Sequence, residues 1–387
     1  MNYSYVATCL FGLESSLGAE LDALGLKRTF TMDGRVYFEG DESACARANI
    51  GLRCAERVYL HLGSFRATTF TELFDGVMAL PWESFIGSAD AFPVKGHSIR
   101  SRLFSVPDCQ KIIKKAVVKR LSEAYRKEWF EETGVRYQIE FFLFKDEAAL
   151  MLDTTGTPLH KRGYRPASGA APLRETLASG LVRETHLKPD ILLWDPFCGS
   201  GTIAIEAAMQ QLHIAPGLKR DFAGMQFPWL GEKLFSDEKQ RCEAEIRRED
   251  PVEIWASDLD PSVLKLAREN AKRAGVEKHI RFFEADARKL EKPDRKGTVL
   301  CNPPYGERLM DQKSAEELYR DLSFSLGRFA PWQVYILTSC ENFEFFYRQK
   351  ADRAKKVYNG MIPCHLFEFY KPKDNAKKAK PAQGRQG

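Results

Sequence analysis

Three carboxylates and one carboxamide each follow a short apolar segment of the chain. They are Asp195 after "DILLW", Asp258 after "VEIWAS", Asp286 after "IRFFEA" and Asn302 after "GTVLC". Apolar runs of this length, bounded by turn residues, are typical of buried strands. In open parallel sheets the carboxyl ends of the strands meet at one edge, where ligands bind. The four side chains therefore predict a site rich in hydrogen-bond acceptors at such an edge.

The first of these carboxylates opens a glycine-containing turn, "DPFCGSGT". Gly199 and Gly201 allow the backbone to approach a ligand closely, and the helix predicted after them offers free N–H groups. No Lys-Ser/Thr pair follows the second glycine, and the spacing is not GxGxxG, so neither phosphate-binding pattern is present. We therefore favour a pocket in which Asp195 accepts hydrogen bonds from a ligand amine.

The next two carboxylates extend this pocket. Asp258 can accept two ribose hydroxyls, although it lies 63 positions after Asp195, against about 20 in dinucleotide-binding folds. An insertion that begins "HIAPGLKRDFAG" fills the interval. Asp286 can accept from an adenine amine. Each acid alone is more typical of a helix cap, but three at successive strand ends favour a ligand site. An amine, a ribose and an adenine without phosphate describe S-adenosylmethionine.

The stretch "NPPY" is the predicted catalytic site, formed by Asn302, Pro303, Pro304 and Tyr305. Two prolines stiffen the chain directly after a strand. The Asn302 carboxamide and the Pro303 carbonyl can accept both hydrogens of a base amine, and Tyr305 can stack on the base. Such catalysis is mainly positioning and electrostatics. The alternative is a proline turn with a packing tyrosine.

These residues require a sheet that brings four strand ends together. Residues 173–371 alternate strands with amphipathic helices, which predicts a parallel, doubly wound α/β sheet. Residues 1–44 and 45–155 form two further α/β regions, and a Gly- and Pro-rich linker spans 156–172. We expect the basic tail, 372–387, to be disordered.

Composition restricts the remaining possibilities. The net charge is +5, but residues 371–387 alone carry +5, so any nucleic-acid surface on the body must be a local patch. Nine cysteines without a CxxC pair argue against a zinc ribbon or a disulfide scaffold and favour reduced thiols in the cytoplasm. The N-terminus does not read as a signal peptide, and no apolar segment reaches the length of a membrane span.

The motifs together resemble a known family. "DPFCGSGT" with "NPPYGERL" resembles the class I methyltransferases that modify exocyclic amines of bases. "LDTTGTPLHKRGYR", "APLRETLASGLV" and "VYNGMIPC" are similar to the bacterial THUMP-domain RNA guanine-N2 methyltransferases, in particular the 23S rRNA group, whose members are often called N6-adenine-specific DNA methylases. The resemblance implies a ferredoxin-like region over 1–44, a THUMP RNA-binding domain over 45–155, and a Rossmann-like methyltransferase domain over 173–371 with a mostly parallel seven-stranded sheet.

The same resemblance implies which residues bind the cofactor and what the chain does. The predicted S-adenosylmethionine site, with no metal, comprises Asp195, Phe197, Cys198, Gly199, Ser200, Gly201, Thr202, Asp258, Asp286, Ala287 and Asn302. The implied reaction is methylation of guanine N2 in RNA, with 23S rRNA or a ribosome-assembly intermediate as partner and neither a membrane nor an obligate protein partner. A tRNA guanine-N2 enzyme, an adenine-N6 DNA enzyme and a non-catalytic RNA-binding protein remain alternatives.

Two cationic segments are the predicted RNA contacts. A helix near 107–128 carries Lys111, Lys114, Lys115 and Lys119, and the linker adds Lys161, Arg162, Tyr164 and Arg165. Such a helix is often only a solvated face, but the THUMP resemblance favours contact with phosphates. Cations beside an aromatic ring can hold an unstacked strand. The alternative for the linker is an inter-domain hinge.

Overall fold

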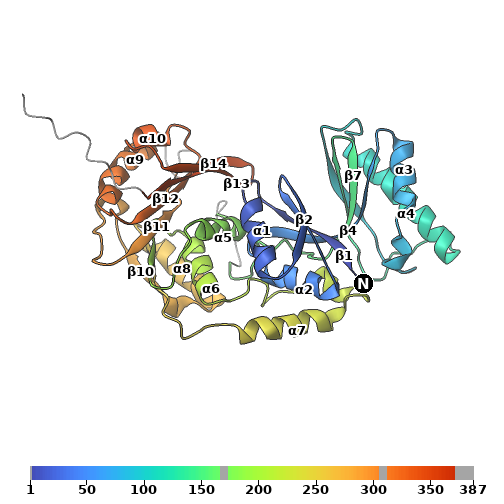
Figure 1. Ribbon diagram of the computed structural model, residues 1–387, viewed down its shortest axis with the longest axis horizontal. Helices are drawn as coiled ribbons and strands as arrows, with labels where there is room; N and C mark the ends of the chain where they lie inside the picture. The colour runs from blue at the N-terminus through green and yellow to red at the C-terminus, as the bar shows by residue number, and fades with distance from the viewer. Residues whose placement is uncertain (1, 166–172, 305–311, 371–387) are drawn as a thin grey trace, which may run out of the picture.

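The chain folds around two seven-stranded sheets that stand side by side, as Figure 1 shows. The computed structural model describes residues 2–165, 173–304 and 312–370. Buried apolar side chains from both sheets belong to one continuous core, and a second core fills the far side of the C-terminal sheet. The two halves of the molecule are therefore packed against each other through apolar contacts.

The N-terminal sheet has the order β2-β3-β1-β4-β7-β6-β5. Its strands are β1 (Tyr3–Cys9), β2 (Lys27–Met32), β3 (Arg35–Gly40), β4 (Ala55–Arg66), β5 (Val94–Ile99), β6 (Ile139–Phe144) and β7 (Glu147–Asp153). All neighbouring pairs are antiparallel except β5 and β6. The long strand β4 pairs with β1 on one side and β7 on the other, so it joins the ferredoxin-like region and the THUMP region into one sheet.

Four helices accompany this sheet: α1 (Glu14–Ala23), α2 (Glu42–Gly51), α3 (Phe70–Met78) and α4 (Val106–Tyr125). Asp41 caps α2 by accepting a hydrogen bond from the Ala44 backbone N–H. The predicted division between residues 44 and 45 therefore falls inside a helix. The helix expected near 107–128 is α4, whose buried face carries Ile113, Val117 and other apolar residues.

The C-terminal sheet has the order β10-β9-β8-β11-β12-β14-β13. Its strands are β8 (Leu192–Asp195), β9 (Ile254–Asp258), β10 (Ile280–Glu284), β11 (Gly297–Cys301), β12 (Gln333–Thr338), β13 (Arg353–Asn359) and β14 (Ile362–Phe369). The first five strands in that order are parallel, and β14 and β13 complete the sheet in antiparallel fashion. The predicted mostly parallel, seven-stranded sheet is confirmed.

Helices cover both faces of the C-terminal sheet. They are α5 (Glu175–Glu184), α6 (Thr202–Gln211), α7 (Gly231–Ala244), α8 (Pro261–Ala274), α9 (Gln312–Gly327) and α10 (Phe343–Phe346). Buried residues of α5, α6 and α8 share a core with Leu193, whereas those of α9 share the other core with Leu192 and Trp194. Because neighbouring residues of a strand point to opposite faces, this split identifies a doubly wound sheet.

The insertion between α6 and β9 joins the two halves of the molecule. Its helix α7 lies along α2, below the two sheets in the view of Figure 1. The ring of Phe227 stacks on Tyr137 at a centroid distance of 4.2 Å, and Trp229 contacts the rings of Tyr3 and Phe85. The long interval between Asp195 and Asp258 therefore reflects an inter-domain brace and leaves the order of the strands unchanged.

Candidate functional site: the carboxyl edge of the C-terminal sheet

Asp195 ends β8 at the point where the order of the strands reverses. The chain continues from β8 to β9 and β10 on one side, and returns to β11 on the other. The carboxyl group is almost fully buried, and among the described residues it accepts one hydrogen bond, from the Phe197 N–H at 3.1 Å. Burial, together with the negative charge of Asp258, raises the pKa of Asp195 to about 8. No described cation lies within ion-pair distance of this carboxyl group.

The turn after β8 holds its shape through backbone contacts. Cys198 N–H donates to the Ser257 carbonyl at 3.0 Å, and Gly201 N–H donates to the Cys198 carbonyl at 2.7 Å. Gly199 and Gly201 have φ values of +50° and +81°, a region that favours glycine. A β-carbon on Gly201 would also lie 3.1 Å from Cβ of Ala267 in α8. Both positions therefore favour glycine through their φ values, and Gly201 also through its lack of space.

Asp258 ties this turn to the neighbouring strand. Its Oδ2 accepts from the Gly199 N–H at 3.0 Å and its Oδ1 from the Asp260 N–H at 3.2 Å. Asp260 caps α8 through the Ser262 N–H, and Gly275 ends that helix with φ of +84°. Each Asp258 oxygen retains further acceptor capacity, since a carboxylate oxygen can accept two hydrogen bonds.

Asp286 lies at the same edge but already has a partner. Its carboxylate accepts from the Arg288 backbone N–H and pairs with the Arg288 guanidinium at 2.8 Å. These hydrogen bonds lower the pKa of Asp286. Here the helix-cap interpretation describes the contacts directly, because Asp286 caps the short turn Ala287–Lys289. An adenine amine would have to share this carboxylate with Arg288.

Asn302 follows β11, next to Asp195 across the switch point. β11 pairs with β8 in parallel. Burial raises the pKa of the Cys301 thiol, and the nearby Asp195 carboxyl adds to this shift. The Asn302 Oδ1 atom is buried and accepts no hydrogen bond from any described residue. Pro303 is buried and Pro304 is partly buried. The remaining member of the predicted catalytic group, Tyr305, lies outside the described residues.

The structure therefore gathers the predicted acceptors at one edge, because the parallel strands β10, β9, β8 and β11 are neighbours. Phe197 and Ser200 are partly exposed there, whereas Cys198, Thr202 and Ala287 are buried. Sequence reasoning missed Asn270 of α8, whose side chain donates to the Ser200 carbonyl at 3.0 Å. Its place on the buried face of the helix was the available signal.

Two of the predicted RNA contacts in the linker are wrong. The Arg162 side chain is only 1% exposed and pairs with Glu206 of α6 at 3.5 Å. The Tyr164 hydroxyl is buried as well and donates to Glu206 Oε1 at 3.0 Å. A fully buried carboxylate requires such partners, which explains why this polar linker packs inward. Lys161 is exposed and stays a predicted RNA contact.

Arg165 has a different position from the one that its charge suggested. It forms an ion pair with Glu175 at 2.6 Å and donates to the Thr202 hydroxyl at 3.2 Å. Thr202 is the first residue of α6, directly after the glycine turn. The linker thus contacts the candidate cofactor site through Arg165, which leaves this guanidinium little freedom to reach a phosphate.

The cationic helix α4 keeps most of its predicted surface. Lys111, Lys115 and Lys119 are exposed. Lys114 is half-buried, pairs with Glu132 and lies 3.6 Å from the centre of the Phe92 ring. Three of the four lysines are therefore available to a polyanion, and the fourth stabilises the domain.

Other kinds of site have less support. Among the described ranges, no cluster of three His, Cys, Asp or Glu side chains could hold a metal ion. None of the described helices is both long and apolar enough to span a membrane. Asp195, Asp258 and Asn302 present hydrogen-bond acceptors at the sheet edge, and acceptors complement a ligand that carries an amine or hydroxyl groups.

Comparison with known families accounts for this geometry. Residues 162–368 match the family described as "RMKL-like, methyltransferase domain". The chain belongs to this family. Residues 4–59 match the RlmL ferredoxin-like domain and residues 67–153 the THUMP domain. The predicted family and the three-part fold are therefore confirmed.

Individual relatives agree with this assignment. The "Putative RNA methyltransferase YpsC" of Bacillus subtilis (strain 168) is 42% identical over 95% of this chain and 96% of its own length. The "Ribosomal RNA large subunit methyltransferase K/L" of Psychromonas ingrahamii is 33% identical over 98% of this chain, which spans only 52% of that protein. The solved structure of SMU.472, in complex with SAH, has 37% identity and a TM-score of 0.89, covering 95% of this chain and 98% of its own. The RMKL-like protein described here is an S-adenosylmethionine-dependent RNA methyltransferase.

Proposed function

We propose that this RMKL-like protein transfers a methyl group from S-adenosylmethionine to the exocyclic N2 amine of a guanine in RNA, with 23S rRNA as the substrate. The observation that carries the proposal is the buried Asn302 Oδ1 atom, which no described residue satisfies. A buried acceptor without a partner costs about 1–3 kcal/mol, so a donor from a ligand is expected there. A base amine is a donor of the right kind.

The residues at the sheet edge fit the cofactor. The buried Asp195 carboxyl, which has a raised pKa and one hydrogen bond, would hold the ammonium group. Asp258 would accept from ribose hydroxyls. The turn at Gly199 would allow close approach, because no described residue other than its chain neighbours lies within 4 Å of the position that a β-carbon would take. When bound, the cofactor supplies a methyl group on a sulfonium centre. Asp286 would accept from the adenine amine in competition with Arg288.

The proposed role of Asn302 is to position the amine of the target base. Its Oδ1 atom and the Pro303 carbonyl would each accept one amine hydrogen, which directs the nitrogen lone pair at the methyl carbon. The nitrogen–carbon bond forms as the carbon–sulfur bond breaks, and the nitrogen loses one proton after the transfer. Preorganised acceptors of this kind contribute about 10²–10³ in rate. The base must be unpaired to reach a site at the sheet edge.

The choice of RNA and of 23S rRNA has separate support. The exposed cations Lys111, Lys115, Lys119 and Lys161 could neutralise phosphates. The relative named for large-subunit ribosomal RNA supports an rRNA substrate, although this chain spans about half of that protein. An rRNA substrate also favours the cytoplasm as the site of action.

Nucleoside analysis tests the proposal. Purified protein would be incubated with isotope-labelled cofactor and with rRNA, tRNA or DNA from a strain that lacks the gene. The nucleic acids would then be digested and their nucleosides separated. We expect label in N2-methylguanosine from 23S rRNA. Label in tRNA alone would mean that the substrate is tRNA and not 23S rRNA. Label in N6-methyladenine from DNA would overturn the proposal.

A further inference from the structure

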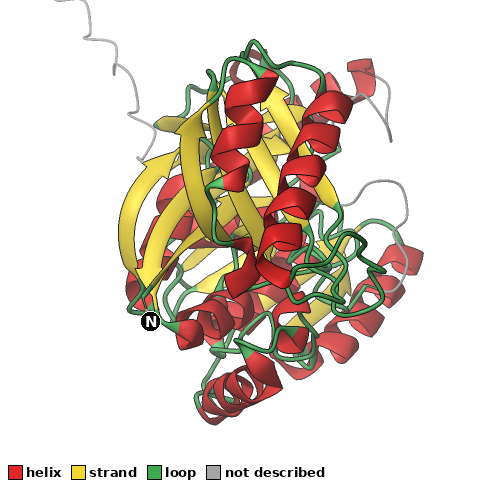
Figure 2. Cartoon of the chain, turned by 90° about the vertical axis from the view of Figure 1, so that its right-hand side faces the viewer, coloured by secondary structure: helices red, strands yellow, loops and turns green. Residues whose placement is uncertain are grey.

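On one face of the N-terminal sheet, none of the described α-helices contributes to the apolar cluster. Its apolar cluster consists of strand residues alone, namely Val6, Tyr59, Phe142 and Met151, with the partly buried Met32, Tyr37 and Phe144 against them. The helices α1 to α4 contribute instead to the core on the opposite face. Figure 2 shows two helices, in front, on one side of the strands. The face with the strand-only cluster presents polar and aromatic side chains outward, without a described segment that covers them all.

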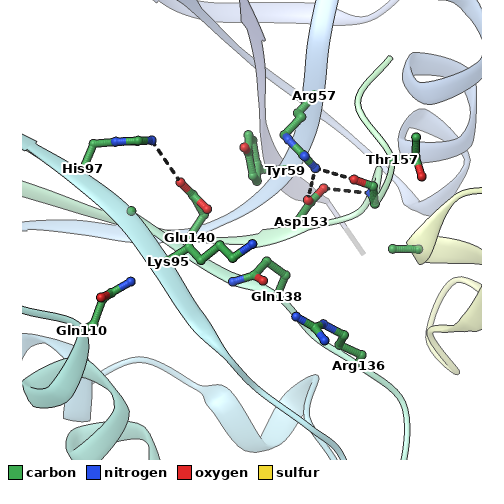
Figure 3. Close-up of a pocket in the computed structure, with 13 residues that line it drawn as sticks. Arg57, Tyr59, Lys95, His97, Gln110, Arg136, Gln138, Glu140, Asp153 and Thr157 are labelled. Carbon is green, nitrogen blue, oxygen red and sulfur yellow. Dashed lines mark hydrogen bonds and ion pairs between the residues drawn. The ribbon is translucent and has the colours of Figure 1, made fainter. Parts of the chain in front are cut away.

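A pocket of about 770 Å³ opens on this face (Figure 3). Alternating residues of four strands form its floor: Arg57 and Tyr59 from β4, Lys95 and His97 from β5, Glu140 from β6 and Asp153 from β7. Its walls are Gln110, Arg136, Gln138, Gly156, Thr157 and Ala223. Pockets of 300–1,000 Å³ commonly hold organic ligands. Because Ala223 belongs to the brace between the domains, the methyltransferase half contributes to this pocket.

Two cations at the pocket are available to a ligand. Lys95 and Arg136 are both exposed, and neither forms an ion pair with a described carboxylate. Arg57, by contrast, is paired with Asp153 and donates to the Gly156 carbonyl at 2.6 Å. Free cations beside a concave surface favour an anionic group such as a phosphate.

The floor of the pocket also offers acceptors. Glu140 accepts no hydrogen bond from a described residue, and its Oε1 lies 3.9 Å from Nε2 of the exposed His97. The Gln138 Nε2 group donates to the carbonyls of Pro93 and Ile139, which leaves the amide oxygen as an acceptor. The ligand should therefore combine a phosphate with adjacent N–H donors.

We propose that this pocket binds one unpaired guanine nucleotide of the RNA substrate, at a site separate from the methylated base. The N1–H and N2–H groups of guanine lie side by side and match the two oxygens of the Glu140 carboxylate. Adenine and cytosine place an acceptor next to their amine, which a carboxylate repels. Lys95 and Arg136 hold the adjoining phosphate. A paired guanine cannot use this edge, so the strand is single here.

One observation connects the pocket to an RNA strand. Gln110 of α4 also lines a neighbouring hollow of about 530 Å³, together with Lys111, Lys114 and Lys115, so the cations of α4 continue the path of a strand.

Partial burial and the charge of Asp153 raise the pKa of Glu140 to about 7, whereas Arg57, Lys95 and Arg35 oppose this shift. The His97 ring also faces this carboxyl group. N–H donors of a bound base would favour the ionised form of Glu140 and so lower its pKa.

The inference rests on the proposed function, because it takes RNA as the partner. The test uses the full chain and fluorescence anisotropy at pH 8 with a labelled, U-rich RNA hexamer that contains one guanine. Replacing this guanine by inosine, which lacks the N2 amine, should weaken binding about 10-fold, the scale of a hydrogen bond to a charged group. Replacing it by 7-deazaguanine, which keeps the N1 and N2 groups, should change nothing.

Protein variants assign this effect to the pocket. With Glu140→Gln the inosine penalty should disappear, whereas with Asn302→Ala it should persist, since that residue belongs to the other site. Lys95→Ala with Arg136→Ala should weaken the binding of all hexamers about 10-fold. Lys278→Ala, which changes an exposed lysine in the short turn before β10, should not. Calorimetry should give each pocket variant the wild-type affinity for S-adenosylmethionine, which would show that its fold is intact.

Each outcome has a distinct meaning. An inosine penalty that persists in Glu140→Gln, or is abolished by Asn302→Ala, overturns the inference. If free guanosine monophosphate binds the pocket as tightly as the hexamer does, the ligand is a free nucleotide, and the RNA assignment is wrong. If the wild-type protein methylates RNA but the pocket variants bind every hexamer normally, the inference fails while the proposed function stands. Absence of methylation of any RNA contradicts the proposed function itself.

Discussion

Replacing Asp195 by asparagine should weaken cofactor binding and stabilise the protein at the same time. The folded pKa of Asp195 is about 8, and its unfolded value is about 3.9. A raised folded pKa means that the folded state holds the proton more tightly, so stability is lost as pH rises from about 4 to about 8. At pH 7 this loss is on the order of 4 kcal/mol. Asparagine avoids it but leaves a buried amide, which costs about 1–3 kcal/mol.

The expected net effect of Asp195→Asn is therefore an increase of about 1–3 kcal/mol in the free energy of unfolding at pH 7. Cofactor binding should change in the opposite direction. A hydrogen bond between charged groups contributes about 1.5–3 kcal/mol, so Kd at pH 8 should rise about 10- to 150-fold. Urea unfolding at pH 5 and pH 7 and calorimetry with S-adenosylmethionine measure the two quantities.

The wild-type protein should show a matching pH dependence. With a pKa of about 8, about one Asp195 carboxyl in ten is ionised at pH 7. An ammonium ligand binds the ionised form, so Kd should fall by about tenfold per unit between pH 6 and pH 7.5, and binding at pH 7 should release about one proton. Above that range the ligand's own α-amino group begins to lose its proton. Calorimetry in buffers of different ionisation enthalpy counts the proton; equal proton counts for wild type and Asp195→Asn would refute the assignment.

The lysines of α4, the buried Glu206 and the glycine turn each allow a further test. Lys111→Ala with Lys115→Ala should lower the salt slope of RNA binding by about two. Lys114→Ala, which loses its contacts with Glu132 and Phe92, should change stability more than the salt slope. Equal salt slopes in the wild type and both variants would place α4 away from RNA. Glu206→Ala should lower the free energy of unfolding by about 3–5 kcal/mol, because it leaves the Arg162 guanidinium buried without its carboxylate partner. An unchanged denaturation midpoint would contradict the inward packing of the linker. Gly201→Ala should lower the free energy of unfolding by about 1–2 kcal/mol, because the φ at this position is +81° and a β-carbon would contact Ala267. The melting temperature should therefore fall, and an unchanged melting temperature would show that the turn tolerates a β-carbon.

Local sequence patterns carried most of the information about the methyltransferase fold. Apolar runs that end in Asp195, Asp258 and Asn302 predicted strands whose carboxyl ends meet, because parallel strands place those ends at one edge. Local signals also mark both ends of α8, because Asp260 caps its start, Pro261 is its first residue and Gly275 follows its last. These signals lie within a few residues of one another, which is why a single sequence contains them.

Contacts between distant segments could not be read in this way. Arg162 and Tyr164 looked like an exposed cationic loop, because their partner Glu206 lies about forty residues away on α6. The brace formed by Phe227 and Trp229 read only as an insertion, since its aromatic partners belong to the other half of the chain. The pocket around Glu140 combines residues of four strands, of α4 and of loops from both halves of the chain, so no local pattern predicted it.

The central claim is that Asn302 positions the amine of the target base for methyl transfer. A single-turnover assay of Asn302→Ala, with 23S rRNA and saturating S-adenosylmethionine, tests it directly. Because the substitution removes one acceptor for the amine, the rate should fall by about 10²–10³. Cofactor affinity should stay within about twofold of the wild type, because the ammonium and ribose acceptors Asp195 and Asp258 are unchanged. Methyl transfer by Asn302→Ala at the wild-type rate would contradict the claim and leave the Asn-Pro-Pro segment as a structural turn.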